Sequence, residues 1–359
     1  MLWPDQRLKT LFGIDHPILQ APMAGTDTPA LAAAVSGAGG LGGLGCGETP
    51  DAALRVLVAE LRLRTGRPFN LNFFVYPEPA TAPATLARTR DRLRPWYDRL
   101  GLGPVPELLA PRPMGFGADK LRLVLDLRPK VASFHFGTPE PQAVRALQAA
   151  GIRVIGSATS VAEARLLEAA GFDAVIAQGY EAGGHRGSHQ PLAAGDGVGT
   201  MALVPQVVDA VRLPVIAAGG IGDGRGIAAA LALGAAGVQM GTAFLLCPEA
   251  ATPEARRVAL RQASDTDTMV SNAFSGRAAR TRRSAYALDM AKSGEALPDF
   301  PTLYDLSGPL MDAGTGEVAF DLWGQASPLA REIPAAEVVA GLVRDTQAVL
   351  SQLAGDKAG

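Results

Sequence analysis

Short apolar segments rich in β-forming residues recur along this chain, and stretches with helical periodicity separate them. Parallel sheets have this pattern, because each strand needs a crossover helix before the next strand can begin. Eight such units favour a (β/α)8 TIM barrel, and an open, doubly wound sheet is the alternative. The candidate strands are Pro17–Ala21, Gly40–Gly45, Phe69–Phe74, Val131–Phe136, Val154–Ser157, Ala174–Gln178, Pro214–Ala218 and Gly237–Gly241.

The regular alternation is interrupted in two places. After residue 245 the sequence is irregular and polar, and helical periodicity returns only near the C-terminal end. We expect residues 1–245 and 330–359 to form the barrel, and residues 246–329 to form an inserted, mainly helical subdomain that binds substrate over the carboxyl ends of the strands. The connection from Pro77 to Pro129 is also long, and its Pro- and Gly-rich part, Gly101–Gly117, is expected to line the site.

Composition limits the classes of partner. The 33 Lys and Arg nearly balance the 35 Asp and Glu, which argues against nucleic acid as a partner. The N-terminal residues have no signal-peptide pattern, and no apolar stretch is long enough to span a membrane. Cys46 and Cys247 form no CxxC pair and are expected to be buried thiols. These features predict a cytoplasmic protein that acts on a small molecule, and they leave the oligomeric state open.

Two glycine-rich segments have the spacing of phosphate-binding loops. In "GGLGGLG" the context is wrong for a dinucleotide fingerprint, because Gly40, Gly42 and Gly45 themselves form the strand. In "PVIAAGGIGDG", Gly219 and Gly220 follow a strand and precede a helix, and "VQMGT" follows the next strand. Barrels often bind phosphate between the loops after strands seven and eight, so backbone amides here, helped by a helix N-terminus, are expected to hold an anion.

Histidine is rare in this chain, and two of its four histidines, His135 and His185, lie near the ends of predicted strands. His185 lies in "QGYEAGGHRG", where the glycines let a loop approach a ligand closely, and its ordinary pKa suits a general base at neutral pH. His189 stands four residues later, but the glycines between the two argue against a helical zinc pair, so no metal site is predicted. His135 lies near the end of the predicted strand in "VASFHFG", and alternation puts it on the opposite side from Phe134 and Phe136, so either the histidine or the two phenylalanines face the barrel interior.

Seven segments in the right order resemble the nitronate monooxygenase family, formerly called 2-nitropropane dioxygenases, and especially its class I enzymes. They are "QAPMAG", "FNLNFF", "VASFHFG", "QGYEAGGHRG", "PVIAAGGIGDG", "VQMGT" and "LWGQ", and they are spread over nearly the whole chain. The resemblance implies a TIM barrel with non-covalent FMN, which would oxidise nitronates or nitroalkanes with O2 to a carbonyl compound and nitrite.

The resemblance also implies roles for single residues. His185 matches the catalytic base, and His135 and Tyr304 match the substrate pocket. The residues that would hold FMN are Pro22, Met23, Asn72, Gln178, Gly183, Gly219, Gly220, Gln239, Met240, Gly241 and Thr242. Amide side chains suit the polar edge of the flavin ring, and bare backbone suits its phosphate.

One departure from the family bears on the substrate. Class I enzymes that oxidise propionate 3-nitronate have a tyrosine-rich stretch with a lysine that would pair with the substrate carboxylate. Here Phe300 replaces a tyrosine, and no lysine occurs from residue 296 to the end except Lys357. Loss of a desolvated charge partner would weaken binding of a carboxylated nitronate by ~2 kcal/mol or more. Arg280, Arg282 or Arg283 could replace the lysine.

Two alternative functions are open at this point. Enoyl-ACP reductases and quinone reductases that use FMN and NAD(P)H share the "EAGGH" and "AAGGI" segments. A flavin-free barrel that binds a phosphorylated metabolite would need only the glycine loops.

Overall fold

The computed structural model describes residues 3–107, 115–193, 195–292, 294–314 and 316–355. Within them, one parallel sheet has the strand order β1-β9-β8-β6-β5-β4-β3-β2. A parallel bridge between Leu19 and Leu41 joins its two ends, so the sheet closes into a barrel. All eight predicted strands are therefore present, and the open sheet is excluded. Their bounds are Ile18–Gln20 (β1), Gly42–Gly45 (β2), Phe69–Phe74 (β3), Val131–His135 (β4), Arg153–Ala158 (β5), Ala174–Gln178 (β6), Val215–Ala218 (β8) and Gly237–Met240 (β9).

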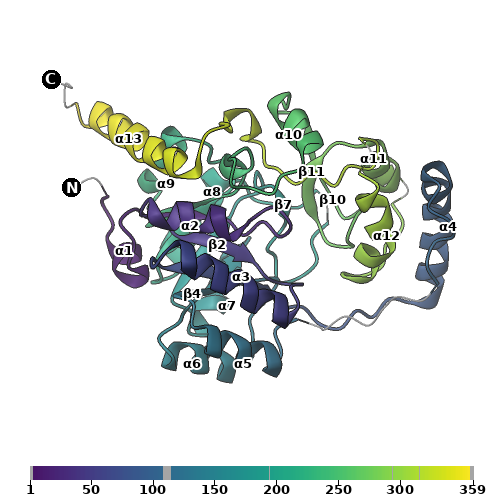
Figure 1. Ribbon diagram of the computed structural model, residues 1–359, viewed down its shortest axis with the longest axis horizontal. Helices are drawn as coiled ribbons and strands as arrows, with labels where there is room; N and C mark the ends of the chain where they lie inside the picture. The colour runs from purple at the N-terminus through teal and green to yellow at the C-terminus, as the bar shows by residue number, and fades with distance from the viewer. Residues whose placement is uncertain (1–2, 108–114, 194, 293, 315, 356–359) are drawn as a thin grey trace.

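The barrel helices surround this sheet (Figure 1). They are Pro29–Gly37 (α2), Asp51–Arg64 (α3), Ala118–Leu127 (α5), Pro141–Ala149 (α6), Val161–Ala169 (α7), Thr200–Ala210 (α8), Gly224–Ala232 (α9) and Ala335–Ala354 (α13). Residues 151, 171 and 234 are glycines with φ of 80°, 80° and 93° just after α6, α7 and α9, a left-handed conformation that suits the end of a helix. Helix α13 packs against both α9 and α2, so the end of the chain completes the helical layer.

A short helix closes the amino-terminal end of the barrel. Helix α1 (Arg7–Phe12) buries Leu8 and Phe12 completely. Both belong to one apolar cluster with Leu19, Val131 and other strand residues that face the barrel interior. The interior is therefore a packed core, and ligands must bind at the opposite, carboxyl end of the strands.

Most of the other elements form a second group beside the barrel, on the right in Figure 1. Strands Thr268–Ser271 (β10), Ala279–Arg282 (β11) and Gly184–His185 (β7) form an antiparallel sheet. The helices are Pro83–Leu100 (α4), Glu254–Arg261 (α10), Ala285–Lys292 (α11) and Thr302–Asp312 (α12), and two short 3-10 turns, Thr242–Phe244 (η1) and Ser327–Leu329 (η2), accompany them.

Helix α4 lies far from residues 246–329 in sequence but packs with them. Leu93, Trp96 and Tyr97 join an apolar cluster with residues of α11 and α12, and Tyr97 Oη donates a hydrogen bond of 2.6 Å to the Leu306 carbonyl. The long connection from Pro77 to Pro129 thus supplies a helix to this second group. Residues 108–114 of the Gly101–Gly117 loop lie outside the described residues.

No helix in the described part of the chain is long and apolar enough to cross a membrane.

Candidate functional site

His185 lies where the second group meets the barrel. The chain leaves β6, turns at Gly184 with φ of 77°, and pairs with β11 so that His185 stands opposite Ala279. Glycine adopts this left-handed conformation without strain, so the glycine frame around His185 has a conformational reason. The strand β7 joins the barrel loop to the sheet of the second group and holds the imidazole between them.

Three phenylalanine rings surround the imidazole. The ring centroid of His185 lies 5.7 Å from that of Phe136, 5.7 Å from that of Phe300 and 6.3 Å from that of Phe320. We call these three phenylalanines the aromatic cluster. Tyr304 lies behind it, 6.2 Å from both Phe300 and Phe320. The side chains around the His185 ring are thus mainly apolar.

The aromatic cluster corrects one prediction. Alternation along β4 would put Phe136 on the opposite side from His135, yet the two rings are 6.4 Å apart and both lie at the carboxyl end of the barrel. Phe136 follows the last residue of β4 and has φ of 75°, which is rare outside glycine. Because the backbone leaves the extended conformation there, alternation no longer applies.

His185 has a polar partner that the sequence did not reveal. Its Nε2 lies 2.8 Å from Ser275 Oγ. Ser275 is a small polar residue in a segment without periodicity, and no local signal marks it. The Ser275 hydroxyl also donates to the Arg277 carbonyl at 3.2 Å and accepts from the Arg277 amide at 3.3 Å, so it has a fixed place in its own loop.

The surroundings keep His185 neutral. Burial lowers the pKa of its imidazole to about 3, and the positive charge of Arg277 and the nearby His135 act in the same direction. At neutral pH the ring is therefore uncharged, and one of its two nitrogens carries a lone pair. Among the described residues, its Nδ1 has no hydrogen-bond partner.

His135 is also neutral, but its hydrogen bonds leave it less freedom. Asn72 Nδ2 donates to the Ser133 carbonyl at 3.2 Å and also lies 3.0 Å from His135 Nδ1. An amide nitrogen can only donate, so His135 Nδ1 accepts and Nε2 carries the proton, which it donates to Ser157 Oγ at 3.1 Å. Burial lowers the pKa of His135 to about 4. His135 is thus a fixed, hydrogen-bonded part of the barrel mouth.

His189 is hydrogen-bonded to the wall of the barrel. Its Nε2 lies 3.0 Å from the Ser157 carbonyl, and its amide donates to Glu163 at 2.8 Å. These bonds hold the loop that follows His185 against β5 and α7.

The loops after β8 and β9 present unpaired backbone amides. Gly219 and Gly220 have φ of 102° and 71°, and a Cβ on Gly219 would lie 2.9 Å from the Gly179 carbonyl oxygen. Among the described residues, no group accepts from the amides of residues 219–221 or of residues 241–243. Consecutive free amides of this kind form a nest for an anion.

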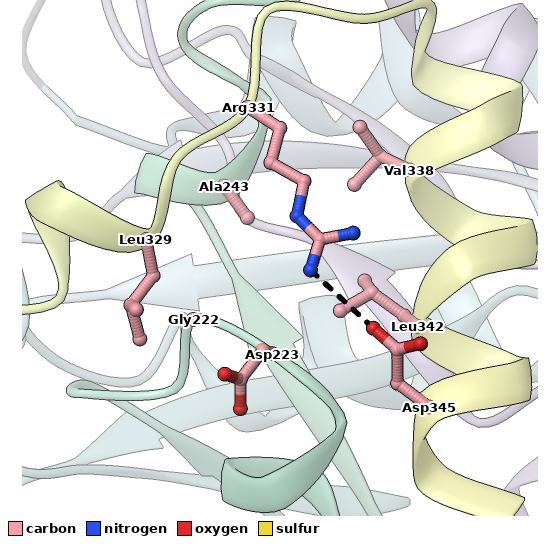
Figure 2. A pocket seen from close by; sticks show the side chains of 8 residues that line it. All are labelled: Gly222, Asp223, Ala243, Leu329, Arg331, Val338, Leu342 and Asp345. Atoms are coloured by element: carbon pink, nitrogen blue, oxygen red, sulfur yellow. Dashed lines mark ion pairs between the residues drawn. The ribbon is translucent and has the colours of Figure 1, made fainter. Parts of the chain in front are cut away.

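The helix N-terminus expected to help there is already occupied. Asp223 caps α9, and its carboxylate accepts from the amides of Arg225 and Gly226. Figure 2 shows Asp223 in a neighbouring hollow, where Arg331 pairs with Asp345 at 3.5 Å. An anion near Gly220 would therefore be held by loop amides and not by α9.

Other residues expected near the cofactor have structural partners. Gln178 donates to the His185 carbonyl at 3.1 Å and accepts from the Gly187 amide at 2.7 Å, so its amide shapes the histidine loop. A Cβ on Gly183 would lie 2.4 Å from the Trp323 carbonyl carbon, which explains the glycine by close backbone packing. Thr242 Oγ1 accepts from the Gly324 amide at 3.0 Å, so the "LWGQ" segment lies against both loops.

The ends of β1 and β9 meet beside these loops. A Cβ on Gly241 would lie 3.6 Å from Met23 Sδ, and the Met23 amide donates to Asp27 at 2.6 Å. The residue after β1, Ala21, donates to the Met240 carbonyl at 2.8 Å and leads into Pro22. Gln239 Oε1 is buried without a hydrogen-bond partner in the described structure.

The three arginines that could replace the missing lysine are used elsewhere. Arg280 donates to the Tyr180 carbonyl at 3.1 and 2.8 Å and to Thr268. Arg282 pairs with Asp321 at 3.5 Å, and Arg283 donates to the Thr266 carbonyl at 3.1 Å. In the described structure, none of the three lies over a ring of the aromatic cluster. The cation that does lie there is Arg277, which the sequence did not single out.

This combination of a closed (β/α)8 barrel, a polar mouth and a neutral histidine on a glycine-framed loop is that of a barrel enzyme. The family model described as "Nitronate monooxygenase" matches residues 5–345. The chain belongs to this family of flavin-dependent oxidoreductases, as the resemblance of its motifs indicated.

Its relatives extend over almost the whole chain. It is 46% identical to a nitronate monooxygenase from Pseudomonas aeruginosa, over 94% of this chain and 98% of the relative. It is 45% identical to one from Paraburkholderia phytofirmans, over 96% of each chain. Among solved structures, a nitroalkane oxidase from Streptomyces ansochromogenes superposes with a TM-score of 0.89 at 37% identity, covering 97% of this chain and 99% of that one. FabK from Thermotoga maritima follows with a TM-score of 0.75 at 32% identity, covering 97% and 98%.

Proposed function

We propose that this protein is an FMN-dependent nitronate monooxygenase that oxidises alkyl nitronates and nitroalkanes with O2 to carbonyl compounds and nitrite. The family and the nitroalkane oxidase likeness support the reaction class. The observation that supports the assignment most directly is His185, which is neutral, lies against an apolar cluster and has one ring nitrogen without a partner in the described structure.

The residues at the barrel mouth fit FMN. The unpaired amides of residues 219–221 and 241–243 would hold the phosphate, and the orphaned Gln239 Oε1 is a buried acceptor that needs a donor. Met23 and Pro22 would supply apolar contact, and Asn72 a polar group, to the ring. Gln178 and Gly183 would act mainly by shaping the loop beside it. When bound, FMN supplies the electron transfer between the nitronate and O2.

His185 would act as the base for neutral nitroalkanes. The Ser275 hydroxyl has one proton, which it donates to the Arg277 carbonyl, so it accepts from His185 Nε2–H. The lone pair of the imidazole is then on Nδ1, the nitrogen without a partner in the described residues. Nδ1 would remove the proton on the carbon next to the nitro group, and the apolar surroundings would exclude competing water.

We further propose that residues 246–329, together with α4, form the substrate-facing part of the molecule. Phe300, Phe320 and Ser275 come from this region and contact His185, and Tyr304 packs behind the two phenylalanines. The two buried free thiols, Cys46 and Cys247, fit a protein of the reducing cytoplasm.

A reductase that uses NAD(P)H is the second candidate, because FabK shares the fold over the whole chain. The enoyl reductase domain of MlnA has a TM-score of 0.67 at 13% identity and shows only that the fold is shared.

Anaerobic flavin reduction separates these candidates. The purified protein is expected to show flavin absorbance, which an alkyl nitronate bleaches while NADH and NADPH leave it unchanged. Rapid bleaching by NADH or NADPH with the nitronate inert would establish the reductase instead. A protein without flavin absorbance that gains none with added FMN would be a flavin-free barrel.

A further inference from the structure

Arg277 is a buried cation, and the charge of Glu163 acts on it without forming an ion pair. Its side chain is in a residue that is only 6% exposed, and among the described residues no carboxylate forms an ion pair with it. Among the described residues, its guanidinium makes one hydrogen bond, from Nη2 to the Ser188 carbonyl at 2.5 Å. Nε and Nη1 donate to no described residue, although a guanidinium carries five N–H donors.

The other buried arginines near the mouth differ from Arg277 in this respect. Arg186 donates to the carbonyls of Gly179 and Gln178 at 2.6 and 2.7 Å. Arg280 makes three hydrogen bonds, to Tyr180 and Thr268. These arginines tie loops together and have an evident structural role. Arg277 has a smaller structural role and more unused donors.

Arg277 also lies where it would contact a substrate bound beside His185. Its guanidinium carbon lies 4.1 Å from the centroid of the Phe136 ring, and that ring is 5.7 Å from the His185 ring. The charge of Arg277 reaches His185, because it contributes to the lowered pKa of that imidazole. Cation, base and aromatic cluster therefore share one small region.

We propose that Arg277 binds the anionic nitronate group of the substrate. This single cation would select nitronates that have one negative charge and an apolar substituent. The inference rests on the proposed function of the same site. A nitronate has two oxygens on one planar nitrogen, which matches the planar fork of a guanidinium as a carboxylate does. The aromatic cluster would contact the substituent.

The same arrangement disfavours a carboxylated nitronate. Such a substrate has two negative charges, whereas Arg280 and Arg282 are held by Tyr180 and Asp321. Its carboxylate would have to lie against phenylalanine rings without a partner, which is costly.

Nitrate is a suitable probe, because it is a stable, planar anion with the same pair of oxygens. Titration calorimetry would compare the purified protein with Arg277→Met, Arg277→Lys and the control Arg282→Met. We expect Arg277→Met to weaken nitrate binding by about 10- to 100-fold, Arg277→Lys to be intermediate, and Arg282→Met to change it less than about twofold. Unchanged nitrate affinity in a folded Arg277→Met protein would overturn the proposal. If Arg277→Met does not fold, wild-type nitrate affinity in the Arg277→Lys protein would overturn the proposal.

Turnover tests the selectivity. We expect kcat/KM of the wild-type protein for propyl nitronate to exceed that for propionate 3-nitronate by about tenfold or more. Equal or reversed preference would refute the selection of singly charged nitronates. If no nitronate is turned over but Arg277→Met still loses nitrate, the anion site stands and the proposed function fails.

Discussion

The imidazole of His185 is a base only if its lone pair is on the nitrogen that can reach a substrate. In our proposal, the Ser275 hydroxyl donates to the Arg277 carbonyl and accepts from His185 Nε2–H, which puts the lone pair on Nδ1. His135 is held in the same tautomer by Asn72 and Ser157. The two neutral histidines thus differ at Nδ1. In His135 the lone pair on this nitrogen accepts a hydrogen bond from Asn72, and in His185 it has no partner among the described residues.

This tautomer can be observed directly. We predict that nuclear magnetic resonance of 15N-histidine-labelled protein shows His185 with a protonated Nε2 and an unprotonated Nδ1. The chain has only four histidines, so His→Asn variants can assign each ring. Ser275→Ala should produce a mixture of tautomers at His185 and leave His135 unchanged. A protonated Nδ1 in the wild-type protein would contradict the assignment of the base.

The pH profile tests the electrostatic effect of Arg277. A positive charge disfavours protonation of a neighbouring imidazole, so removal of Arg277 should raise the pKa of His185 from its low value. With a neutral nitroalkane, wild-type kcat/KM should stay level as the pH falls from about 8 to about 5, well below the ordinary histidine pKa. In Arg277→Met the loss of activity at acid pH should begin at higher pH, and in Arg282→Met it should not move. A shift toward lower pH would contradict this account.

At the scale of single elements, the loops after β8 and β9 present unpaired amides, which we propose bind the phosphate of FMN. Gly219 needs its positive φ, and it also packs closely on Gly179. The sequence predicted this region because two glycines follow a strand and precede a helix. It could not predict that Asp223 would cap α9, since an aspartate at that position can either cap or face solvent.

Gly219→Ala tests the loop geometry. A residue other than glycine at φ of 102° costs about 1–3 kcal/mol, and the new Cβ would contact the Gly179 carbonyl at 2.9 Å. We expect weaker FMN binding in fluorescence titrations and a lower unfolding temperature. Gly66→Ala is the matched control, because nothing lies within 4 Å of its Cβ. Equal effects of the two changes would show that the loop conformation has no special role.

Elements built from local patterns were predictable, and those built from distant contacts were not. The eight strands coincide with apolar runs, so periodicity found them all. The sheet of β7, β10 and β11 joins segments separated by more than eighty residues, and β7 has only two residues, Gly184 and His185. Ser275 and Arg277 are brought to His185 by this pairing, which is why the sequence revealed the histidine but neither of its partners.

The whole molecule is a barrel closed at one end and covered at the other. Helix α1 fills the amino-terminal end, and the second group of elements lies beside the carboxyl end (Figure 1). Because α4 belongs to this second group by packing, both long interruptions of the βα pattern contribute to the same region. This arrangement supports our proposal that the substrate binds between the barrel and the second group.

The packing of α1 into the amino-terminal end of the barrel leads to a prediction about stability. Phe12 is completely buried among residues of the barrel interior, so Phe12→Ala should reduce the free energy of unfolding by about 3–5 kcal/mol. Leu63, which is 89% exposed, is the control, and Leu63→Ala should change it by less than about 0.5 kcal/mol. Urea unfolding monitored by circular dichroism measures both. A small effect of Phe12→Ala would mean that α1 is not part of the core.

The central claim is that His185 removes a proton from neutral nitroalkanes and is dispensable once the nitronate is preformed. The most direct test is kcat/KM of His185→Asn for a nitroalkane and for its preformed nitronate, with His189→Asn as the control. We predict a loss of about 10²- to 10⁴-fold on the nitroalkane, less than about tenfold on the nitronate, and little change on either in the control. Equal losses of His185→Asn on both substrates would contradict the account.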